Sequence, residues 1–171
     1  MSLVWLATSF CYYLILMLAD TFKDVYLTGL TNGLAEIIAY FINGFIYDKL
    51  GIKPTLMISF SIATIGGLLI LIWGLDNQGS PLFFIFFLLS KFGITSNWTV
   101  NYAAMDYLFP TLFRATAIGV CSFLARGFSS ISFLVGGLDE PTPMIIFTTA
   151  CGSMIFASLF LRTEKKAEVV V

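Results

Sequence analysis

Three ionisable residues interrupt long apolar stretches of this 171-residue chain: Glu36, Lys91 and Arg126. A charge near the middle of a bilayer costs about 2.5–3.5 kcal/mol on insertion scales, so such residues usually face a protein interior or a water-filled cavity on a transport route. In such a cavity an acidic side chain suits a positive group and a basic side chain suits a negative one. We interpret Glu36 and Arg126 as cavity-lining, and Lys91 as equally consistent with a structural role.

A structural alternative remains open for these three charges. Glu36 could pair with Arg126 or with Lys91 and hold two helices together, since breaking a buried ion pair is costly whatever its function. Gly29 and Gly33 have the small-xxx-small spacing that indicates close packing of one helix against another.

Polar residues recur at helical spacing around each charge, which predicts polar faces on three membrane helices. These faces comprise Asn32, Glu36, Tyr40 and Asn43; then Lys91, Thr95, Trp98 and Tyr102, with Asn97 and Asn101 one step around; and finally Gly119, Ser122, Arg126, Ser129 and Ser130. The candidate substrate-binding residues drawn from this pattern and from the first apolar segment are Tyr13, Asn32, Glu36, Tyr40, Lys91, Trp98 and Arg126.

The elements that must position these residues are membrane helices. Only 11% of residues are charged and 58% are hydrophobic, against about a quarter charged in soluble domains. A helix needs about 20 apolar residues to cross the hydrocarbon layer, and six segments meet this requirement: 2–19, 27–48, 55–75, 82–104, 112–137 and 143–162. The prediction is an all-α membrane protein, with a six-helix transmembrane domain over 1–163 and a short charged cytosolic tail over 164–171.

Basic residues gather on one side of these predicted spans. Cytosolic loops are enriched in Lys and Arg, and one side carries Lys49, Lys53, Arg114, Arg162, Lys165 and Lys166. The other side has Lys23 alone among Asp20, Asp24, Asp76, Asp139 and Glu140. This asymmetry predicts that the loops after the second and fourth spans, and the tail, are cytosolic.

The sequence lacks residues that several classes of function require. The chain has no histidine, which removes the usual general base and the commonest metal ligand. Cys11, Cys121 and Cys151 lie in apolar runs without the spacing of a metal site. We therefore expect no enzyme activity, no metal and no cofactor. The glycosylation sequon at Asn97 falls inside a predicted span, so we discard it.

Two stretches resemble known transporters. The run GFIYDKLGIKP, Gly44 to Pro54, resembles the loop between helices eight and nine of the major facilitator superfamily. The run LFPTLFRATAIGVCSFLAR, Leu108 to Arg126, resembles the start of helix eleven in its organic ion branch, solute carrier family 22. KFGITSNWTVNY and GLAEIIAYFINGF are similar to the tenth and eighth helices of that branch. The resemblance implies a six-helix bundle equivalent to helices seven to twelve, the C-terminal half of a transporter that works by alternating access.

The resemblance also implies roles for individual positions. A glutamate at the position of Glu36 is common in cation and zwitterion carriers, whereas a base at the position of Arg126 is typical of anion and carnitine-type carriers. The presence of both Glu36 and Arg126 in this chain therefore favours an anion or a zwitterion as substrate. Asp48, Lys49, Gly51 and Arg114 match the family's gating loops.

This chain also departs from the family pattern. Ile52 and Tyr107 replace a basic and an acidic residue of the gating loops, and Ser132 and Phe133 stand where a late proline is expected. Such changes would suit relaxed or lost transport.

A lone half would leave its polar faces against lipid, so a partner is expected besides the bilayer and a small organic ion. That partner would be a missing N-terminal half of which this chain is a fragment, a second copy in a homodimer, or other membrane subunits. In the last case the chain would be a structural subunit that no longer transports. We expect no nucleic-acid partner, and favour the plasma membrane over an organelle membrane.

Overall fold

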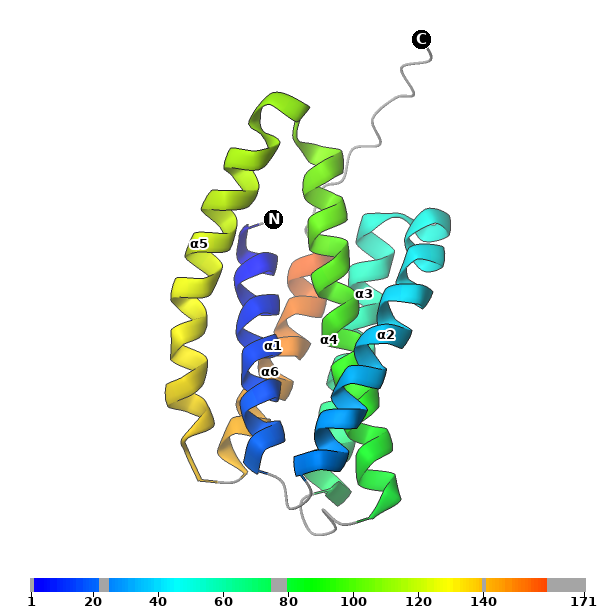
Figure 1. The fold of residues 1–171 in the computed structure, drawn as a ribbon, viewed down its shortest axis with the longest axis vertical. Helices are drawn as coiled ribbons and strands as arrows, with labels where there is room; N and C mark the ends of the chain where they lie inside the picture. The colour runs from blue at the N-terminus through cyan, green and yellow to red at the C-terminus, as the bar shows by residue number, and fades with distance from the viewer. Residues whose placement is uncertain (1, 22–24, 75–79, 140, 160–171) are drawn as a thin grey trace.

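The computed structural model describes residues 2–21, 25–74, 80–139 and 141–159, and these form a bundle of long helices without strands (Figure 1). The helices are α1 (Ser2–Thr21), α2 (Val25–Leu50), α3 (Ile52–Leu69), α4 (Pro81–Leu108), α5 (Thr111–Gly136) and α6 (Thr142–Leu159), and α3 continues as a π-helical turn, η1 (Ile70–Gly74). The predicted all-α, six-helix fold is confirmed. The predicted tail over 164–171 lies outside the described residues.

Five of the six helices are apolar and long enough to cross a membrane: Ser2–Ala19, Ile52–Gly74, Pro81–Tyr107, Thr111–Gly136 and Thr142–Leu159. The exception is α2, which contains Glu36, Asp48 and Lys49. With 26 residues, α2 is about 39 Å long at 1.5 Å per residue. Its length therefore suffices for a span, and its polar residues are what set it apart.

The helices alternate in direction and form two layers. In the view of Figure 1, α5, α1, α4 and α2 lie in front, whereas α3 and α6 lie behind them. We call the surface formed by α5, α1, α4 and α2 the front face. The turns after α2 and α4 lie at the same end as the N-terminus, which brings Lys49, Lys53 and Arg114 to one end, as the charge pattern predicts. There Lys53 donates from Nζ to the backbone oxygen of Leu159 at 2.6 Å.

Local sequence explains where two helices end. Gly51 has φ +81°, a conformation that favours glycine, and its N–H donates to the backbone oxygen of Tyr47 at 2.9 Å. This allows α3 to begin at Ile52, with only Gly51 between the two helices. Pro110 disfavours helical geometry in the residue before it, and Phe109 is accordingly extended. The helix α4 ends at Leu108, four residues later than the predicted boundary at 104.

Glycines permit close contact between α3 and α4. A methyl group built at Gly93 would lie 2.5 Å from the backbone nitrogen of Ala63 and 2.6 Å from the backbone oxygen of Ser59. At Gly66 it would lie 2.6 Å from the backbone nitrogen of Ser90. Gly29 and Gly33, to which the sequence assigned close packing, make no such contact within the described part of the chain, because nothing there lies within 4 Å of a methyl group built at either position. The same spacing occurs on exposed and on buried helix faces, so spacing alone does not identify the contact.

Replacing Gly93 with alanine is expected to destabilise the bundle by about 2 kcal/mol, since the new methyl group overlaps backbone atoms that cannot rotate away. Gly119→Ala is the matched control, because a methyl group there meets nothing within 4 Å, and it should change stability by less than about 1 kcal/mol. Thermal unfolding in detergent would compare the two variants. Equal midpoints would contradict the close α3–α4 contact.

The fraction of each helix that is buried inside the bundle differs sharply from helix to helix. Only 17% of the apolar window of α5 is buried, against 56% for α1 and for α4. In α5 the buried residues are Ala125, Ser129 and Ser132, which share one side of the helix. The helices α5 and α2 form the two edges of the front face (Figure 1). Both edge helices therefore leave a large part of their surface uncovered by the described chain.

Candidate functional site

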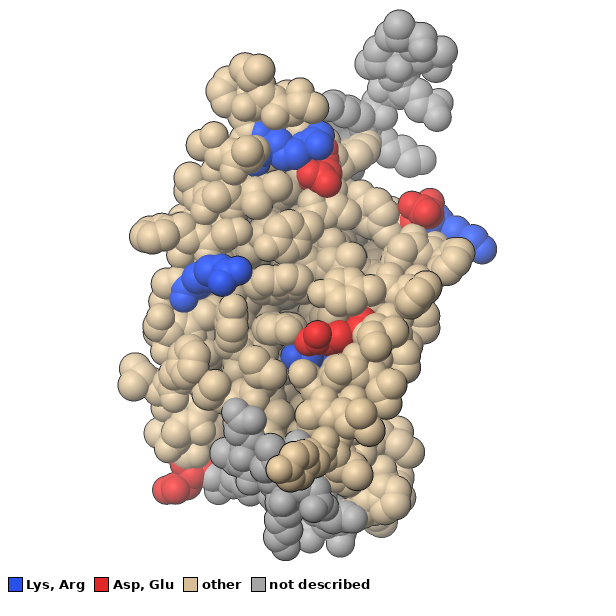
Figure 2. Space-filling model, viewed as in Figure 1, with Lys and Arg blue, Asp and Glu red and all other residues tan. Residues whose placement is uncertain are grey.

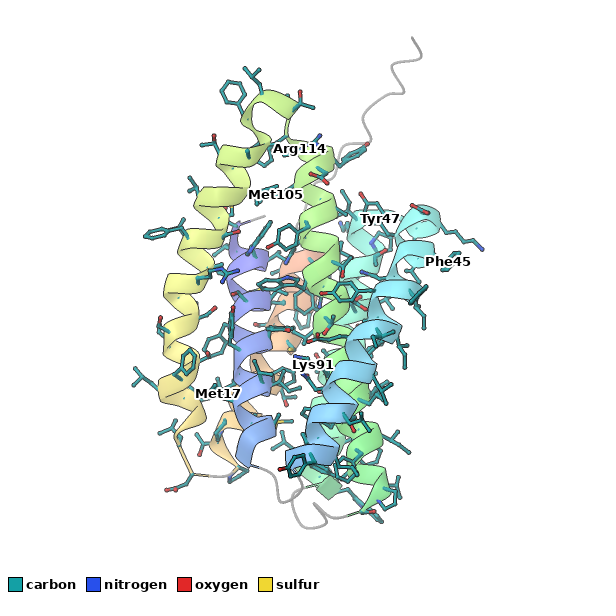
Figure 3. All side chains as sticks on the ribbon, viewed as in Figure 1. Met17, Phe45, Tyr47, Lys91, Met105 and Arg114 are labelled. Atoms are coloured by element: carbon teal, nitrogen blue, oxygen red, sulfur yellow. The ribbon has the colours of Figure 1, made fainter. Side chains whose placement is uncertain are left out.

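An acid and a base meet in the middle of the front face. Lys91 Nζ of α4 lies 3.5 Å from Glu36 Oε1 of α2, with the Lys91 side chain fully buried and that of Glu36 28% exposed. Figure 2 shows an acidic and a basic side chain together at the centre of this face, and Figure 3 labels Lys91 there. Of the two ion pairs that the sequence left open for Glu36, the structure therefore contains the one with Lys91.

Tyr12 of α1 completes this group. Its hydroxyl donates to Glu36 Oε1 at 2.7 Å, and Lys91 Nζ lies 3.7 Å from the centre of its ring. A cation over an aromatic face is stabilised by the ring quadrupole, most strongly away from water. We call Tyr12, Glu36 and Lys91 the central triad. It joins helices α1, α2 and α4.

Aromatic residues surround the central triad. Ring centroids lie 5.3 Å apart for Tyr12 and Trp98, 6.0 Å for Trp98 and Tyr102, and 4.9 Å for Tyr102 and Trp5. Tyr13 packs edge-on against Tyr12 at 5.6 Å. The candidates Trp98 and Tyr13 thus lie beside the triad, and they provide flat apolar surface next to its charges.

Arg126, unlike Lys91, has no partner for its charge among the described residues. It is exposed on α5, and the described side chains provide it with neither an ion pair nor a hydrogen bond. Ser129, three residues on, is buried instead against α1, where its hydroxyl lies 2.7 Å from that of Ser9. The alternative pair between Glu36 and Arg126 is therefore not formed, because α1 and α4 lie between the helices that carry them (Figure 1).

The polar face predicted for α2 divides into exposed and buried positions. Tyr40 is 52% exposed and remains accessible near Glu36. Asn32 is half-buried, and its Oδ1 is buried without a hydrogen-bond partner among the described residues. Asn43 is 1% exposed and donates from Nδ2 to the backbone oxygen of Ser96 at 2.8 Å. It contacts α4 directly.

Asn97 and Asn101 do not reach the front face. They are 0% and 1% exposed, and they follow Gly93 at intervals of four on the side of α4 that packs against α3. Their side-chain amides have no hydrogen-bond partner among the described residues. Burial of Asn97 also agrees with discarding the sequon.

The residues matched to gating loops lie at the end of the bundle that carries the N-terminus. Asp48 and Lys49 are exposed in the last turn of α2. Arg114 Nε lies 3.4 Å from Asp106 Oδ1, and its Nη2 donates to the backbone oxygen of Asp106 at 2.9 Å. Asp106 thus supplies an acidic partner for Arg114, although Tyr107 stands where the resemblance leads us to expect an acidic residue. Ile52 is 7% exposed and packs into the core.

A small cavity lies between α2 and α4. Its volume is about 160 Å³, and its lining comes from Asn43, Gly44, Tyr47 and Asp48 of α2 and from Thr99, Val100 and Ala103 of α4. Gly44 and Asp48 follow Glu36 and Tyr40 at intervals of four, so the cavity opens on the same face as the central triad.

Tyr12 is the residue that sequence reasoning missed. The polar pattern of the sequence does not single it out, whereas its neighbour Tyr13 is among the candidates. A tyrosine in mid-span carries a hydroxyl that usually finds a partner when buried, which is a weak signal. Only the packing of α1 against α2 and α4 shows which of the two adjacent tyrosines meets Glu36.

No protein-family model matches the chain. The chain is 29% identical over 147 residues to solute carrier family 22 member 6 of Mus musculus, which covers 85% of this chain and 26% of that protein. It is 33% identical over 148 residues to solute carrier family 22 member 4 of Mus musculus, covering 84% and 26%.

Organic anion transporter 3 of Rattus norvegicus is 28% identical over 153 residues, covering 87% of this chain and 28% of that protein. The chain thus spans about a quarter of the length of these relatives. The similarity to each of these proteins extends over most of this chain. Several members of solute carrier family 22 thus match most of this chain, which supports its placement as a solute carrier family 22-like member of the major facilitator superfamily.

Proposed function

We propose that this chain forms one half of a carrier for small organic anions and that Arg126 is the counter-charge for the substrate's carboxylate. The observation that carries the proposal is the difference between the two basic residues of the front face. Lys91 is buried against Glu36, whereas Arg126 is exposed and has no acidic partner among the described residues.

Electrostatics favours an anion over a cation on this face. Glu36 contributes −1 and Lys91 contributes +1, so the ion pair sums to zero and Arg126 leaves a net charge of +1. A positive site with low-dielectric walls attracts anions. Guanidinium also binds carboxylates through two parallel hydrogen bonds, which adds geometric specificity.

A zwitterion is the second candidate, and a specific observation supports it. The Glu36 side chain is 28% exposed, so an ammonium group can reach its carboxylate from the front face while Lys91 stays beneath. Tyr40 and Trp98 would then flank the ammonium group. Such a substrate would need to bridge from α2 to α5.

Transport would require a second set of helices over the front face. The exposed edges α2 and α5 and the exposed Arg126 support a second six-helix half, with substrate held between the halves during alternating access. The relatives' greater length and the name of one relative, organic anion transporter 3, are consistent with this arrangement. We place the assembly in the plasma membrane as part of the same proposal.

Ligand binding to the protein in lipid nanodiscs tests the charge preference. Benzoate, benzylammonium and phenylalanine share an aromatic body and differ in charge, so isothermal titration compares anion, cation and zwitterion directly. We expect benzoate to bind at least about tenfold more tightly than benzylammonium, equivalent to about 1.4 kcal/mol. Preference for benzylammonium would overturn the proposal. Binding of none of the three would favour a structural subunit of a larger complex.

A further inference from the structure

Helix α5 carries Arg126 along an edge of the front face, beside α1 (Figure 1). Its buried residues are Ala125, Ser129 and Ser132, and Ala125 belongs to a small buried cluster with Trp5 of α1. Small residues let two helices approach closely, but they interlock less than the ridges formed by large side chains. The direction in which Arg126 points therefore depends most on the directional contacts between α1 and α5.

Ser9 and Ser129 make a directional contact of this kind. Their hydroxyl oxygens lie 2.7 Å apart, and Ser129 also donates to the backbone oxygen of Ala125 at 2.7 Å. A hydroxyl group has one proton to donate, so both contacts are hydrogen bonds only if Ser9 donates to Ser129. We call this chain of two bonds the hydroxyl relay. It runs from α1 to the carbonyl group of the residue immediately before Arg126.

The hydroxyl relay is shielded from competing partners. Its two serines are 0% and 2% exposed, so water does not reach their hydroxyl groups. Two further contacts between α1 and α5 are less directional. Ser2 Oγ lies 3.9 Å from Cys121 Sγ in an exposed position, and the ring centroids of Phe10 and Phe128 lie 6.0 Å apart.

We propose that Ser9 and Ser129 are positioning residues for the anion site. The hydroxyl relay holds the turn of α5 that carries Arg126, and so directs the guanidinium group to the front face. Neither serine touches the substrate, because both side chains are buried. This inference rests on the proposed role of Arg126 as the counter-charge, and it adds the contact that fixes its direction.

Benzoate binding in nanodiscs tests the relay with single and double variants. Ser9→Ala and Ser129→Ala should each weaken binding about threefold, equivalent to the roughly 0.6 kcal/mol that a hydrogen bond between membrane helices contributes on average. The double variant should be no weaker than either single variant, because both changes break the same bond. Additive losses would overturn the relay.

Ser132→Ala is the matched control on the same helix. Its hydroxyl is also buried, but it donates within α5, to the backbone oxygen of Ser129 at 2.5 Å. The variant loses a serine hydroxyl without losing a bond to α1, and it should bind benzoate as the parent does. A loss equal to that of Ser129→Ala would show that any buried hydroxyl of α5 matters equally, and it would overturn the proposal.

The effect of Ser129→Ala should also depend on Arg126. In an Arg126→Gln background, Ser129→Ala should leave benzoate binding unchanged, since the group that the relay positions is gone. A residue that only stabilises the fold would lower the affinity by the same factor in both backgrounds. That result would overturn the positioning role.

Amide hydrogen exchange separates this inference from the proposed function, because it needs no ligand. The amides of residues 122–130 should exchange at least about threefold faster in Ser9→Ala and Ser129→Ala than in the parent, and at the parent's rate in Ser132→Ala. If the parent binds no benzoate while exchange changes in this way, the proposed anion function fails and the relay stands. Unchanged exchange in Ser129→Ala would overturn the relay, whatever the ligand result.

Discussion

Replacing Arg126 with glutamine is expected to weaken benzoate binding about 30-fold or more, corresponding to the roughly 2 kcal/mol lost when one partner of a charge pair is removed. Arg126 is exposed and has no partner among the described residues, so the fold should not depend on its charge. Thermal unfolding of the variant should therefore match that of the parent. Loss of binding with unchanged stability would separate a ligand contact from a structural role.

Two further variants sharpen this prediction. Arg126→Lys retains the charge but loses the planar fork, and it should recover only part of the affinity. Arg114→Gln is the control, because Arg114 is engaged with Asp106 at the end of the bundle and should leave benzoate binding within about twofold. Unchanged benzoate binding in Arg126→Gln would remove Arg126 from the site.

Glu36→Leu is expected to destabilise the bundle by about 3 kcal/mol, the lower range for breaking a buried ion pair. The reason is that Lys91, with a fully buried side chain, would lose its only ion-pair partner among the described residues. Lys91→Met should cost less, because Glu36 remains 28% exposed and keeps the hydrogen bond from Tyr12. Unfolding in a detergent titration would give both free energies.

The double variant Glu36→Leu/Lys91→Met isolates the pairwise contribution. It should be more stable than Glu36→Leu alone, since no uncompensated charge stays buried, and the cycle should show a coupling energy above about 1 kcal/mol. Asp106→Asn with Arg114→Gln provides the exposed comparison, with side chains 60% and 34% exposed, and should show coupling of about 0–1 kcal/mol. Additive effects of Glu36→Leu and Lys91→Met would contradict the ion pair.

The outline of the fold is predictable because lipid imposes a length rule on each helix. Apolar runs of about 20 residues locate the six helices, and Gly51 and Pro110 explain two of their turns through backbone geometry alone. The hydropathy pattern also identifies the one exception, because the polar residues of α2 set it apart from the five apolar spans. Local chemistry determines these features, so no tertiary contact is needed to infer them.

Side-chain partners in the candidate site are not predictable in the same way. Helical spacing puts Asn97 and Asn101 close to Trp98 along the chain, yet they pack toward α3 while Trp98 contacts Tyr12. A rotation of α4 by one residue moves a side chain by 100° around the axis, and sequence spacing does not say which neighbour each direction meets. The identification of Tyr12 required the packing of three helices.

The sequence by itself determined that this is a six-helix membrane protein with charges at Glu36, Lys91 and Arg126 in mid-span, since hydrophobicity and helix length are properties of a single segment. Its motifs also indicated the family. The tertiary structure alone decided that Glu36 pairs with Lys91 and Tyr12 and that Arg126 remains exposed. These are relations between helices, and they depend on the order and rotation in which α1 and α4 pack between α2 and α5.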